Sequence, residues 1–467
     1  MSCPATSAGG ERFPGPTPVG HLRHLPGLLG LGGPYRTLLD LHRRHGPVCA
    51  VGFGRHRYTL LFGTEANRLV LADPPARPRF LSGEVLGLLV PVVGARAMVV
   101  SDGEEHRRRR ALVQPAFTHR RVRAHLPLML EEIHRVLARW RPGQRVDAFT
   151  ELRGCIRRIA VRALFGPRLQ AHTESIGRDL ETALRYVNRS PFLRCDRDLP
   201  GSAFHRAMAA RRRVDDRVRA EIAHRRSAPG DEEDVLDALL SSATPAGDRL
   251  TDGEVRDQVI SLIASGYDSS SAAAGWAVHV LVNRPDLWER LADEVTAVAA
   301  GRPLTASHLD AMPYLDWTIS ELLRLFTPGV LTGRTAREEI TFVGHRIPAG
   351  TRLLHSAYVT HRLPRVWDEP LEFRPDRWNP ARAGHRPPHP YAYIPFGGGY
   401  RRCVGAAFAE LELRALVAEL VRCTELAPVR RTVRPTGVAT MWPHGGVPVT
   451  VRAVRPPHPA RGTSRAS

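Results

Sequence analysis

The feature that most constrains this chain is a glycine-rich loop at residues 396–405, which delivers a single cysteine, Cys403, to the start of a predicted helix. The loop reads FGGGYRRCVG, and the segment after it has helix-forming composition with apolar residues at three- and four-residue spacing. Unpaired N–H groups at a helix start, together with Arg401 and Arg402, favour an anion there. We therefore expect a lowered thiol pKa, and the thiolate is the form of cysteine that binds a metal.

One cysteine does not build a zinc site, because zinc needs several nitrogen or sulfur ligands close together, and no CxxC or HxxxH flanks the loop. A single thiolate suits an iron whose other ligands come from a macrocycle. Gly399 and Gly405 would let the backbone approach a flat ring. Phe396 would shield the sulfur, and Arg401 could pair with a propionate. The alternative is a buried, unreactive cysteine beside an ordinary turn.

The pattern F-x-x-G-x-R-x-C-x-G resembles the haem-binding loop of the cytochrome P-450 superfamily, and all five signature positions are present. A chance match in a chain of this length is of order 10⁻⁴ at average residue usage. The resemblance implies that Cys403 ligates the iron of haem b, and that Phe396, Arg401 and Gly405 contact this cofactor. It also implies a mainly α fold, in which a large helical domain surrounds the haem beside a small β-rich subdomain.

A helix is predicted to start near Ser101, because Ser101 and Glu104 stand three residues apart, as in a capping box. On this helix His106 and Arg110 are four residues apart and share one face. By itself, the run of arginines around them favours a solvated, charged face. The family carries H-x-x-x-R followed by Pro-x-Phe, as this chain does, so the resemblance implies that His106 and Arg110 hold haem propionates.

A second capping box at Thr251 predicts a long helix that runs to about Asn283, before an Arg-Pro pair. Its middle, residues 264–270, reads ASGYDSS, and one Gly and three Ser lower the helix propensity there. The residues alone leave two interpretations. The serines line a close contact between helices, or the turn is loosened to present an acid and an alcohol.

This turn resembles the family motif Ala/Gly-Gly-x-Asp/Glu-Thr above the iron, which implies that Asp268 and Ser269 relay protons in catalysis. Two positions depart from the motif: Ser265 replaces a small apolar residue, and Ser269 replaces the usual Thr. Ser keeps the hydroxyl but lacks the methyl group that restricts the rotamer. We therefore expect proton delivery, with looser coupling of oxygen use to product.

Glu321 and Arg324 form an E-x-x-R pair on one helix face, which by itself predicts only a surface ion pair worth less than about 1 kcal/mol. Downstream, residues 375–378 resemble the P-x-R-[F/W] segment of the family. The resemblance implies a Glu321–Arg324–Arg377 network that holds the haem loop. Arg334 stands thirteen residues after Glu321, where the family places another propionate-binding Arg.

The composition is strongly basic, with a net charge of +20, which can indicate a nucleic-acid partner. The sequence contains no Lys, and its 67 basic residues are spread along the chain, as expected from a GC-rich bacterial genome. No recognition motif accompanies them, so we expect no nucleic-acid partner. The six cysteines form no disulfide framework, and no stretch approaches the roughly 20 apolar residues of a membrane span. We expect a cytoplasmic protein without a membrane anchor.

The length of 467 residues alone would suggest two or three domains, but no linker or repeat supports a division. We predict a flexible Pro- and Gly-rich lead-in at residues 1–20, a single cytochrome P-450 domain at 21–452, and a disordered tail at 453–467. Residues 35–45 predict an amphipathic helix, and residues 48–62 predict a β-hairpin.

The resemblance covers nearly the whole chain and implies a haem-thiolate monooxygenase. Such an enzyme inserts one oxygen atom from O₂ into an apolar small-molecule substrate, by hydroxylation or epoxidation, here expected in secondary metabolism. The chain ends soon after the helix of the haem loop, so we expect electrons from NAD(P)H through an external ferredoxin and ferredoxin reductase. An acidic ferredoxin could dock on Arg107, Arg108 and Arg402.

Three alternatives stay open. The first is a hydroperoxide-driven or rearranging haem-thiolate enzyme of the same fold. The second is a haem-binding sensor without catalysis. The third is an Arg-rich nucleic-acid binder.

Overall fold

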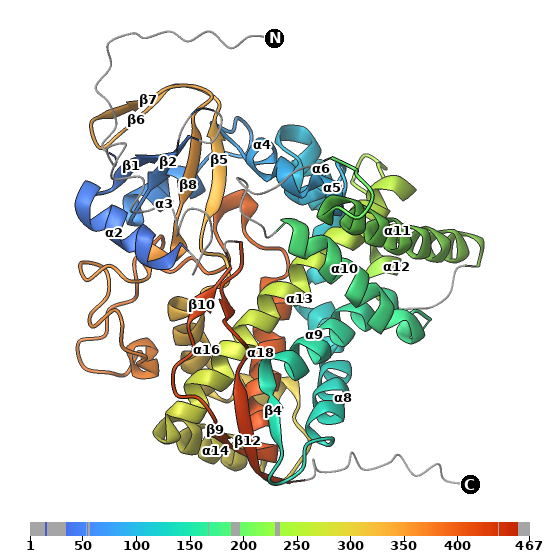
Figure 1. Ribbon diagram of the computed structural model, residues 1–467, viewed down its shortest axis with the longest axis vertical. Coiled ribbons are helices and arrows are strands. Elements are labelled where there is room, and N and C mark those ends of the chain that lie inside the picture. The colour runs from blue at the N-terminus through green and yellow to red at the C-terminus, as the bar shows by residue number, and fades with distance from the viewer. Residues whose placement is uncertain are drawn as a thin grey trace.

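The computed structural model describes residues 15, 34–52, 54, 57–166, 168–187, 197–228, 234–437 and 439–455. Helices make up most of it, and Figure 1 shows a smaller β-rich region beside the helical body. The α-helices are α2 (Tyr35–His45), α3 (Thr64–Leu71), α4 (Gly83–Leu86), α5 (Val90–Val93), α6 (Gly103–Val113), α7 (His119–Ala124), α8 (Leu126–Leu137), α9 (Ala148–Phe165), α10 (Thr173–Val187), α11 (Ala203–Ser227), α12 (Val235–Ser241), α13 (Asp252–Asn283), α14 (Pro285–Ala299), α15 (Ala306–Asp310), α16 (Pro313–Leu325), α17 (Ala357–Thr360) and α18 (Ala406–Cys423).

The strands form a five-stranded sheet, a three-stranded sheet and two short two-stranded sheets. They are β1 (Val48–Val51), β2 (Tyr58–Leu61), β3 (Phe80–Leu81), β4 (Arg145–Asp147), β5 (Thr332–Ala336), β6 (Ile340–Phe342), β7 (His345–Ile347), β8 (Arg352–His355), β9 (Thr424–Pro428), β10 (Pro435–Thr436), β11 (Trp442–Pro443) and β12 (Pro448–Val454). Among the described residues, no helix combines the length and the apolar character that a membrane span requires.

Helix α13 is the centre of the helical body and contains 32 residues, which gives it a length of about 48 Å. Its predicted capping box is confirmed. The Glu254 N–H donates to the Thr251 hydroxyl at 3.3 Å, and the Thr251 N–H donates to the Glu254 carboxylate at 3.0 Å. Figure 1 shows α13 crossing the middle of the molecule, and both α9 and α18 pack against it.

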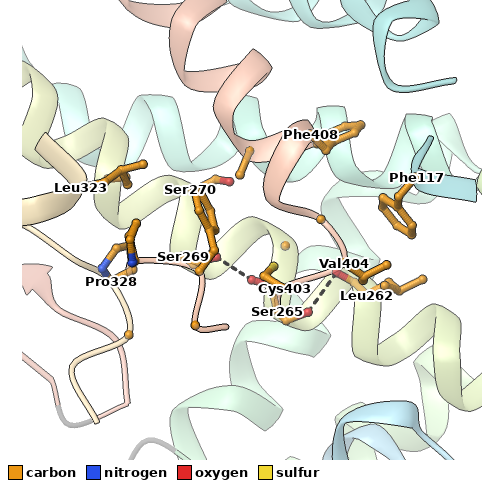
Figure 2. A pocket seen from close by; sticks show the side chains of 18 of the residues that line it. Phe117, Leu262, Ser265, Ser269, Ser270, Leu323, Pro328, Cys403, Val404 and Phe408 are labelled. Carbon is orange, nitrogen blue, oxygen red and sulfur yellow. Dashed lines mark hydrogen bonds between the residues drawn. The ribbon is translucent and has the colours of Figure 1, made fainter. Parts of the chain in front are cut away.

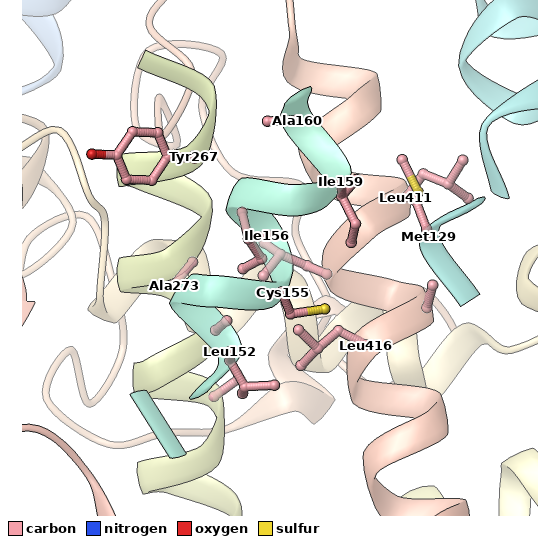
Figure 3. Close-up of a cluster of buried hydrophobic side chains, with 14 of the residues drawn as sticks. Met129, Leu152, Cys155, Ile156, Ile159, Ala160, Tyr267, Ala273, Leu411 and Leu416 are labelled. Atoms are coloured by element: carbon pink, nitrogen blue, oxygen red, sulfur yellow. The ribbon is translucent and has the colours of Figure 1, made fainter. Parts of the chain in front are cut away.

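The core between these helices is closely packed and apolar, as Figure 3 shows around α9. Cys155 of α9 is fully buried there, beside Leu416 of α18 and Ile156 of its own helix. Burial raises the pKa of the Cys155 thiol above its ordinary value. Cys155 is therefore an unreactive core residue. This is the role that the sequence analysis gave as the alternative to metal binding for a single cysteine.

The five-stranded sheet has the strand order β1-β2-β8-β5-β3, and only β2 and β8 pair in parallel. The predicted hairpin is confirmed, with Val48 of β1 opposite Leu61 of β2. Neighbouring strands β5 and β8 pair antiparallel, so Arg334 lies opposite Leu353 and His355 lies opposite Thr332. The sheet thereby brings two ionisable side chains, Arg334 and His355, to one region.

The three-stranded sheet has the order β4-β12-β9 and extends further than expected. Ala453 and Val454 belong to β12 because they pair with Glu425 and Thr424 of β9, so the predicted tail is wrong for these two residues. The rest of that tail, from residue 456, lies outside the described residues. The predicted lead-in at 1–20 also lies outside them, apart from Gly15.

The predicted capping box at Ser101 is wrong, because the N-cap of α6 is Asp102 and no side chain caps this helix. The Ser101 hydroxyl instead donates to the Ala97 carbonyl at 2.7 Å. The Asp102 carboxylate accepts the Ser82 N–H at 2.8 Å and also binds Arg401. The Asp102 carboxylate thus contacts distant segments, whereas the Ser101 hydroxyl makes a local contact with the preceding turn. The spacing of Ser101 and Glu104 reveals neither contact.

Candidate active site

The glycine-rich loop ends at a helix, as predicted, with Gly405 at the N-cap of α18. The Cys403 N–H donates to the Phe396 carbonyl at 2.9 Å and closes the loop. Gly399 has a φ of +60°, and a Cβ built there would stand 2.0 Å from the Leu71 carbonyl oxygen. Only glycine therefore fits that position.

A cavity of about 370 Å³ lies between this loop and α13. Cys403 opens onto it, together with Phe396, Arg401 and Gly405 from the loop and Ser269 from α13. Figure 2 shows further lining residues, which are mainly apolar: Phe117, Leu262, Leu323, Pro328, Val404 and Phe408. The cavity therefore combines one thiol with walls that suit an apolar ligand.

The prediction that the pKa of the Cys403 thiol is lowered is wrong for the protein chain without a bound metal. Burial raises the pKa of the Cys403 thiol, and this effect outweighs the Gly405 N–H, Arg110 and Arg402, which lower it. Arg401 does not help, because its guanidinium turns to Asp102 and the Ser101 carbonyl. A bound metal cation would supply the missing positive charge, since coordination deprotonates a thiol.

Arg334 and His355 line the cavity and are 5% and 3% exposed. Arg334 donates only to the Gly333 carbonyl, at 2.7 Å, and neither ring nitrogen of His355 has a partner among the described residues. Burial, together with neighbouring arginines, lowers the pKa of Arg334 to about 10 and that of His355 to about 3. Buried polar groups are normally hydrogen-bonded, so this pair lacks an acceptor.

His106 and Arg110 of α6 approach the same region. His106 is 2% exposed, and its Nδ1 has no partner in the described part of the chain. Burial lowers its pKa to about 3, and the positive charges of Arg401, Arg110 and Arg334 add to this effect. The Arg110 guanidinium likewise has no hydrogen bond or ion pair to the described residues. We call His106, Arg110, Arg334 and His355 the Arg–His cluster.

Ser269 and Asp268 are adjacent in α13 but face different surroundings. The Ser269 hydroxyl lines the cavity and donates to the Ser265 carbonyl at 2.8 Å. Asp268 is buried, and its Oδ1 lies 3.4 Å from Arg153 of α9 rather than on the cavity wall. Burial raises the pKa of Asp268, and Arg153 opposes this shift. Arg153 also lies 5.1 Å from the Trp442 ring centroid, so it is held by aromatic contact as well.

The predicted network behind the loop is confirmed. Arg324 binds Glu321 with two hydrogen bonds of 2.8 Å, and Arg377 donates to the same carboxylate at 2.9 Å. The Trp378 indole N–H adds a bond of 3.0 Å. Glu321 and Arg324 are fully buried and fully paired, which is the arrangement that buried ions require.

His361 connects this network to the cysteine loop. Its Nδ1 lies 3.0 Å from the Arg324 carbonyl, and its Nε2 lies 3.0 Å from the N–H of Ile394, two residues before Phe396. Because a backbone N–H can only donate, Nε2 is the acceptor and Nδ1 carries the proton. A displacement of Arg324 would therefore be transmitted to the loop.

Comparison with known proteins decides the family. A family model described as "Cytochrome P450" matches residues 13–442. The chain belongs to the cytochrome P450 family. It is 42% identical to cytochrome P450 139 of Mycobacterium tuberculosis over 90% of this chain and 98% of that protein. The P450 fold is found again in the retinoic acid-bound cyanobacterial CYP120A1, with a TM-score of 0.85, 24% identity, and coverage of 96% of this chain and 100% of that one.

Some relatives within this family are named for the reaction that they catalyse. The chain is 30% identical to cyclooctat-9-en-7-ol 5-monooxygenase of Streptomyces melanosporofaciens, over 83% of this chain and 84% of that protein. It is 31% identical to pentalenene oxygenase of Streptomyces avermitilis, over 75% and 78%. The P450 is therefore a monooxygenase, an oxidoreductase of a family that uses haem iron and O₂ and takes its electrons from outside.

Sequence reasoning missed four residues of this P450 site. His355 and Glu412 line the cavity, Arg153 holds Asp268, and His361 joins the loop to its supporting network. His361 belongs to a segment, HRLPRVW, that resembles a family motif. The motif marks His361 as a residue of interest but does not indicate what it does. The other three depend on pairings between distant segments.

Proposed function

We propose that this P450 holds a haem b through the Cys403 thiolate and inserts one oxygen atom from O₂ into an apolar small molecule, by hydroxylation or epoxidation. The observation that carries the proposal is that Arg334 and His355 of the Arg–His cluster line the same apolar cavity as Cys403 while they lack acceptors among the described residues. The other two members interact electrostatically with this site, His106 with Arg334 and Arg110 with Cys403. A haem carries two carboxylates and an iron that a cysteine thiolate can ligate, so these residues fit it.

Within this proposal, Arg110, Arg334 and His106 bind the haem propionates. Arg401 adds to them through its Nε, which has no partner although the rest of its guanidinium binds Asp102. Phe396 packs beside the sulfur. Gly405 admits the flat ring, since a Cβ built there would meet no atom within 4 Å. When bound, the haem supplies the oxygen-activating chemistry. The protein binds and orients the reactants and excludes water from the site.

Asp268 and Ser269 relay protons to the cavity in this proposal. Ser269 is in position to do so, because its hydroxyl lies on the cavity wall. Asp268 would first have to leave Arg153, so proton transfer depends on how readily the Arg153–Asp268 ion pair opens. Ser269 lacks the methyl group of Thr, so we expect part of the reducing power to be lost as peroxide.

The substrate that we propose is an apolar molecule of secondary metabolism. The mainly apolar cavity walls support this class, and so do the activities for which the two Streptomyces relatives are named. Terpene hydrocarbons and terpene alcohols are therefore the first compounds to test, with fatty acids as a second class.

The electron donor that we propose is an acidic ferredoxin with its reductase. Of the arginines named for docking, Arg107 pairs with Glu104, and Arg108 donates to Glu254 at 2.8 Å. Arg402 is exposed and has no ion pair to the described residues, so it carries most of the docking role. Arg402→Gln should raise the KM for ferredoxin and flatten its salt dependence. Arg346→Gln, in a surface pair with Glu339 on the β-rich region, is the control.

The decisive test is turnover with ¹⁸O₂, NADPH, ferredoxin and ferredoxin reductase. One labelled oxygen atom in the product supports the proposal. Product formed only with peroxide and without reductant would support the hydroperoxide-driven alternative. A ligand-dependent spin shift without any product would support the sensor.

A further inference from the structure

A second cavity, of about 340 Å³, lies at the end of α8. Its walls come from the last turn of α8 and the segment that follows it, from Cys423 at the end of α18, and from Val454 and Arg455 where β12 ends. None of its lining residues lines the cavity at Cys403. Figure 1 shows α8 and β12 in the lower part of the view, away from the β-rich region. The proposed function does not use this second cavity, which we call the α8 cavity.

Trp140 lines the α8 cavity and carries a donor that the described part of the chain does not satisfy. Its side chain is 2% exposed, and its indole Nε1 is buried without a hydrogen-bond partner among the described residues. An indole N–H can only donate, and a buried donor without an acceptor costs free energy. A ligand with an acceptor oxygen in the α8 cavity would remove this cost.

The charges on the walls of the α8 cavity favour an anionic ligand. Arg141 lines the cavity, and its guanidinium donates to the Ala138 carbonyl at 2.6 Å and the Trp140 carbonyl at 3.0 Å, without a carboxylate partner among the described residues. Arg455 also lines the cavity, but it is paired with the exposed Glu425. A guanidinium has five N–H donors in a planar fork that matches a carboxylate, so Arg141 keeps donors for a ligand.

The buried acid behind this wall, Glu419 of α18, does not oppose an anion because its charge is compensated. Its carboxylate binds Arg422 at 2.8 Å, lies 3.1 Å from Nε2 of His134, and accepts the Cys423 thiol at 3.2 Å. Burial alone would raise the pKa of Glu419, but His134 and Arg422 outweigh burial and lower it. Burial and Glu419 raise the pKa of the Cys423 thiol to about 12, so Cys423 presents a neutral sulfur to the cavity.

We propose that the α8 cavity binds a small apolar carboxylate, at a site separate from the haem-thiolate centre. The carboxylate accepts from the Trp140 indole N–H and from the Arg141 guanidinium, which it can satisfy together because it has two acceptor oxygens. The apolar body of the ligand contacts Leu137, Pro142 and Val454, which line the same cavity. A volume of about 340 Å³ lies within the ordinary range of small-molecule sites. The inference is independent of the proposed function, because neither Cys403 nor a haem takes part.

Octanoate is the probe, and the indole N–H signals of the full chain labelled with ¹⁵N-tryptophan report its binding. The Trp140 signal is the one that disappears in Trp140→Phe. We expect octanoate to move this signal downfield in a saturable titration of both the apo and the haem-loaded protein, because the N–H gains an anionic acceptor. Octan-1-ol has the same apolar body without the charge, so it should bind about tenfold more weakly or less tightly still. A Trp140 signal that does not move at the highest octanoate concentration that leaves the protein folded would overturn the proposal.

Arg141→Gln should weaken octanoate binding, followed at the Trp140 signal, by about 10- to 100-fold and leave octan-1-ol binding unchanged, because it removes only the positive charge. The control is Arg139→Gln, since Arg139 pairs with Glu151 at 2.9 Å and does not line the cavity. It should change neither affinity, and unchanged positions of the other indole signals show that each variant is folded. The same octanoate affinity in Arg141→Gln and wild type, or equal affinities for octanoate and octan-1-ol, would overturn the assignment of a carboxylate ligand.

Discussion

Two groups of ionisable residues flank the Cys403 loop. They differ in how many of their polar atoms have hydrogen-bond partners. Behind the loop, the Glu321 carboxylate accepts from Arg324, Arg377 and Trp378. On the cavity side, the Arg–His cluster has ring nitrogens without partners in the part of the chain that the structure describes, where Arg334 donates only to the carbonyl of its neighbour.

The difference separates a structural role from a binding role. A buried ion pair with all its partners holds its surroundings in place, and breaking it is costly. Buried cationic groups without acceptors cost folding energy unless a ligand supplies the acceptors. Replacing residues of the two groups should therefore have opposite effects on the free energy of unfolding of the apo protein.

The largest effect is expected from Glu321→Gln, because it leaves Arg324 and Arg377 buried with an incomplete partner. We expect the free energy of unfolding to fall by about 3–5 kcal/mol in urea titrations, with loss of haem retention. The control is Glu339→Gln, which removes an exposed pair with Arg346 and should cost about 0.5 kcal/mol or less. Equal losses in the two variants would contradict a structural role for the network.

Arg334→Met should instead leave the apo protein as stable as the wild type, or more so, since it removes a buried guanidinium without an anionic partner. Haem should be held about 10- to 100-fold more weakly, because a charge-assisted hydrogen bond is lost. Haem transfer to an acceptor protein measures this change. If apo Arg334→Met is destabilised as much as Glu321→Gln, the contrast between the two groups fails.

The next largest effect is expected on the pH dependence of the free energy of unfolding. The pKa of His355 falls from 6.5 to about 3 in the folded apo protein, so between these values the unfolded chain binds more protons. Stability should therefore decrease as the pH falls below about 6.5 and be fully present above it. His355→Phe should reduce this slope by about 1.4 kcal/mol per pH unit.

Urea unfolding at pH 5 and pH 7 measures that slope, with the exposed residue His444 replaced by Gln as the control. Haem binding should also reduce the slope, since a carboxylate beside His355 favours its protonated form. A slope that is the same in wild type, His355→Phe and haem-loaded protein would show that His355 does not face the ligand.

Trp378→Phe should have the smallest effect, because Glu321 keeps both arginines when it loses the indole N–H. We expect a loss of about 1 kcal/mol in the free energy of unfolding, with haem retained. A loss as large as that of Glu321→Gln would mean that Trp378, rather than the ion pairs, holds the loop.

The sequence predicts those parts of the site that lie within single segments. The Cys403 loop with its following helix and the long helix from Thr251 follow from local spacing. The pairing of Glu321 with Arg377 across 56 residues was reached only through the family resemblance. Local chemistry alone predicts a surface ion pair there.

Features that depend on distant segments escaped the sequence. Among the described residues no side chain caps α6, because the carboxylate of its N-cap residue Asp102 instead binds Arg401, 299 residues away. The partner of Asp268 also escaped the sequence, because Arg153 of α9 lies 115 residues away along the chain. The predicted lowering of the thiol pKa failed for the same reason, since spacing along the chain does not report that Cys403 opens onto an internal cavity, where desolvation raises the pKa.

The central claim is that Cys403 ligates haem iron as a thiolate in the cavity that Arg334 and His355 of the Arg–His cluster line. The reduced, carbon monoxide-bound absorption spectrum of wild type and Cys403→His tests it most directly. The account predicts the red-shifted Soret band that gives the family its name in the wild type, and its loss in Cys403→His. A Soret band at the ordinary haem position in the wild type, or a red-shifted band that survives in Cys403→His, would contradict it.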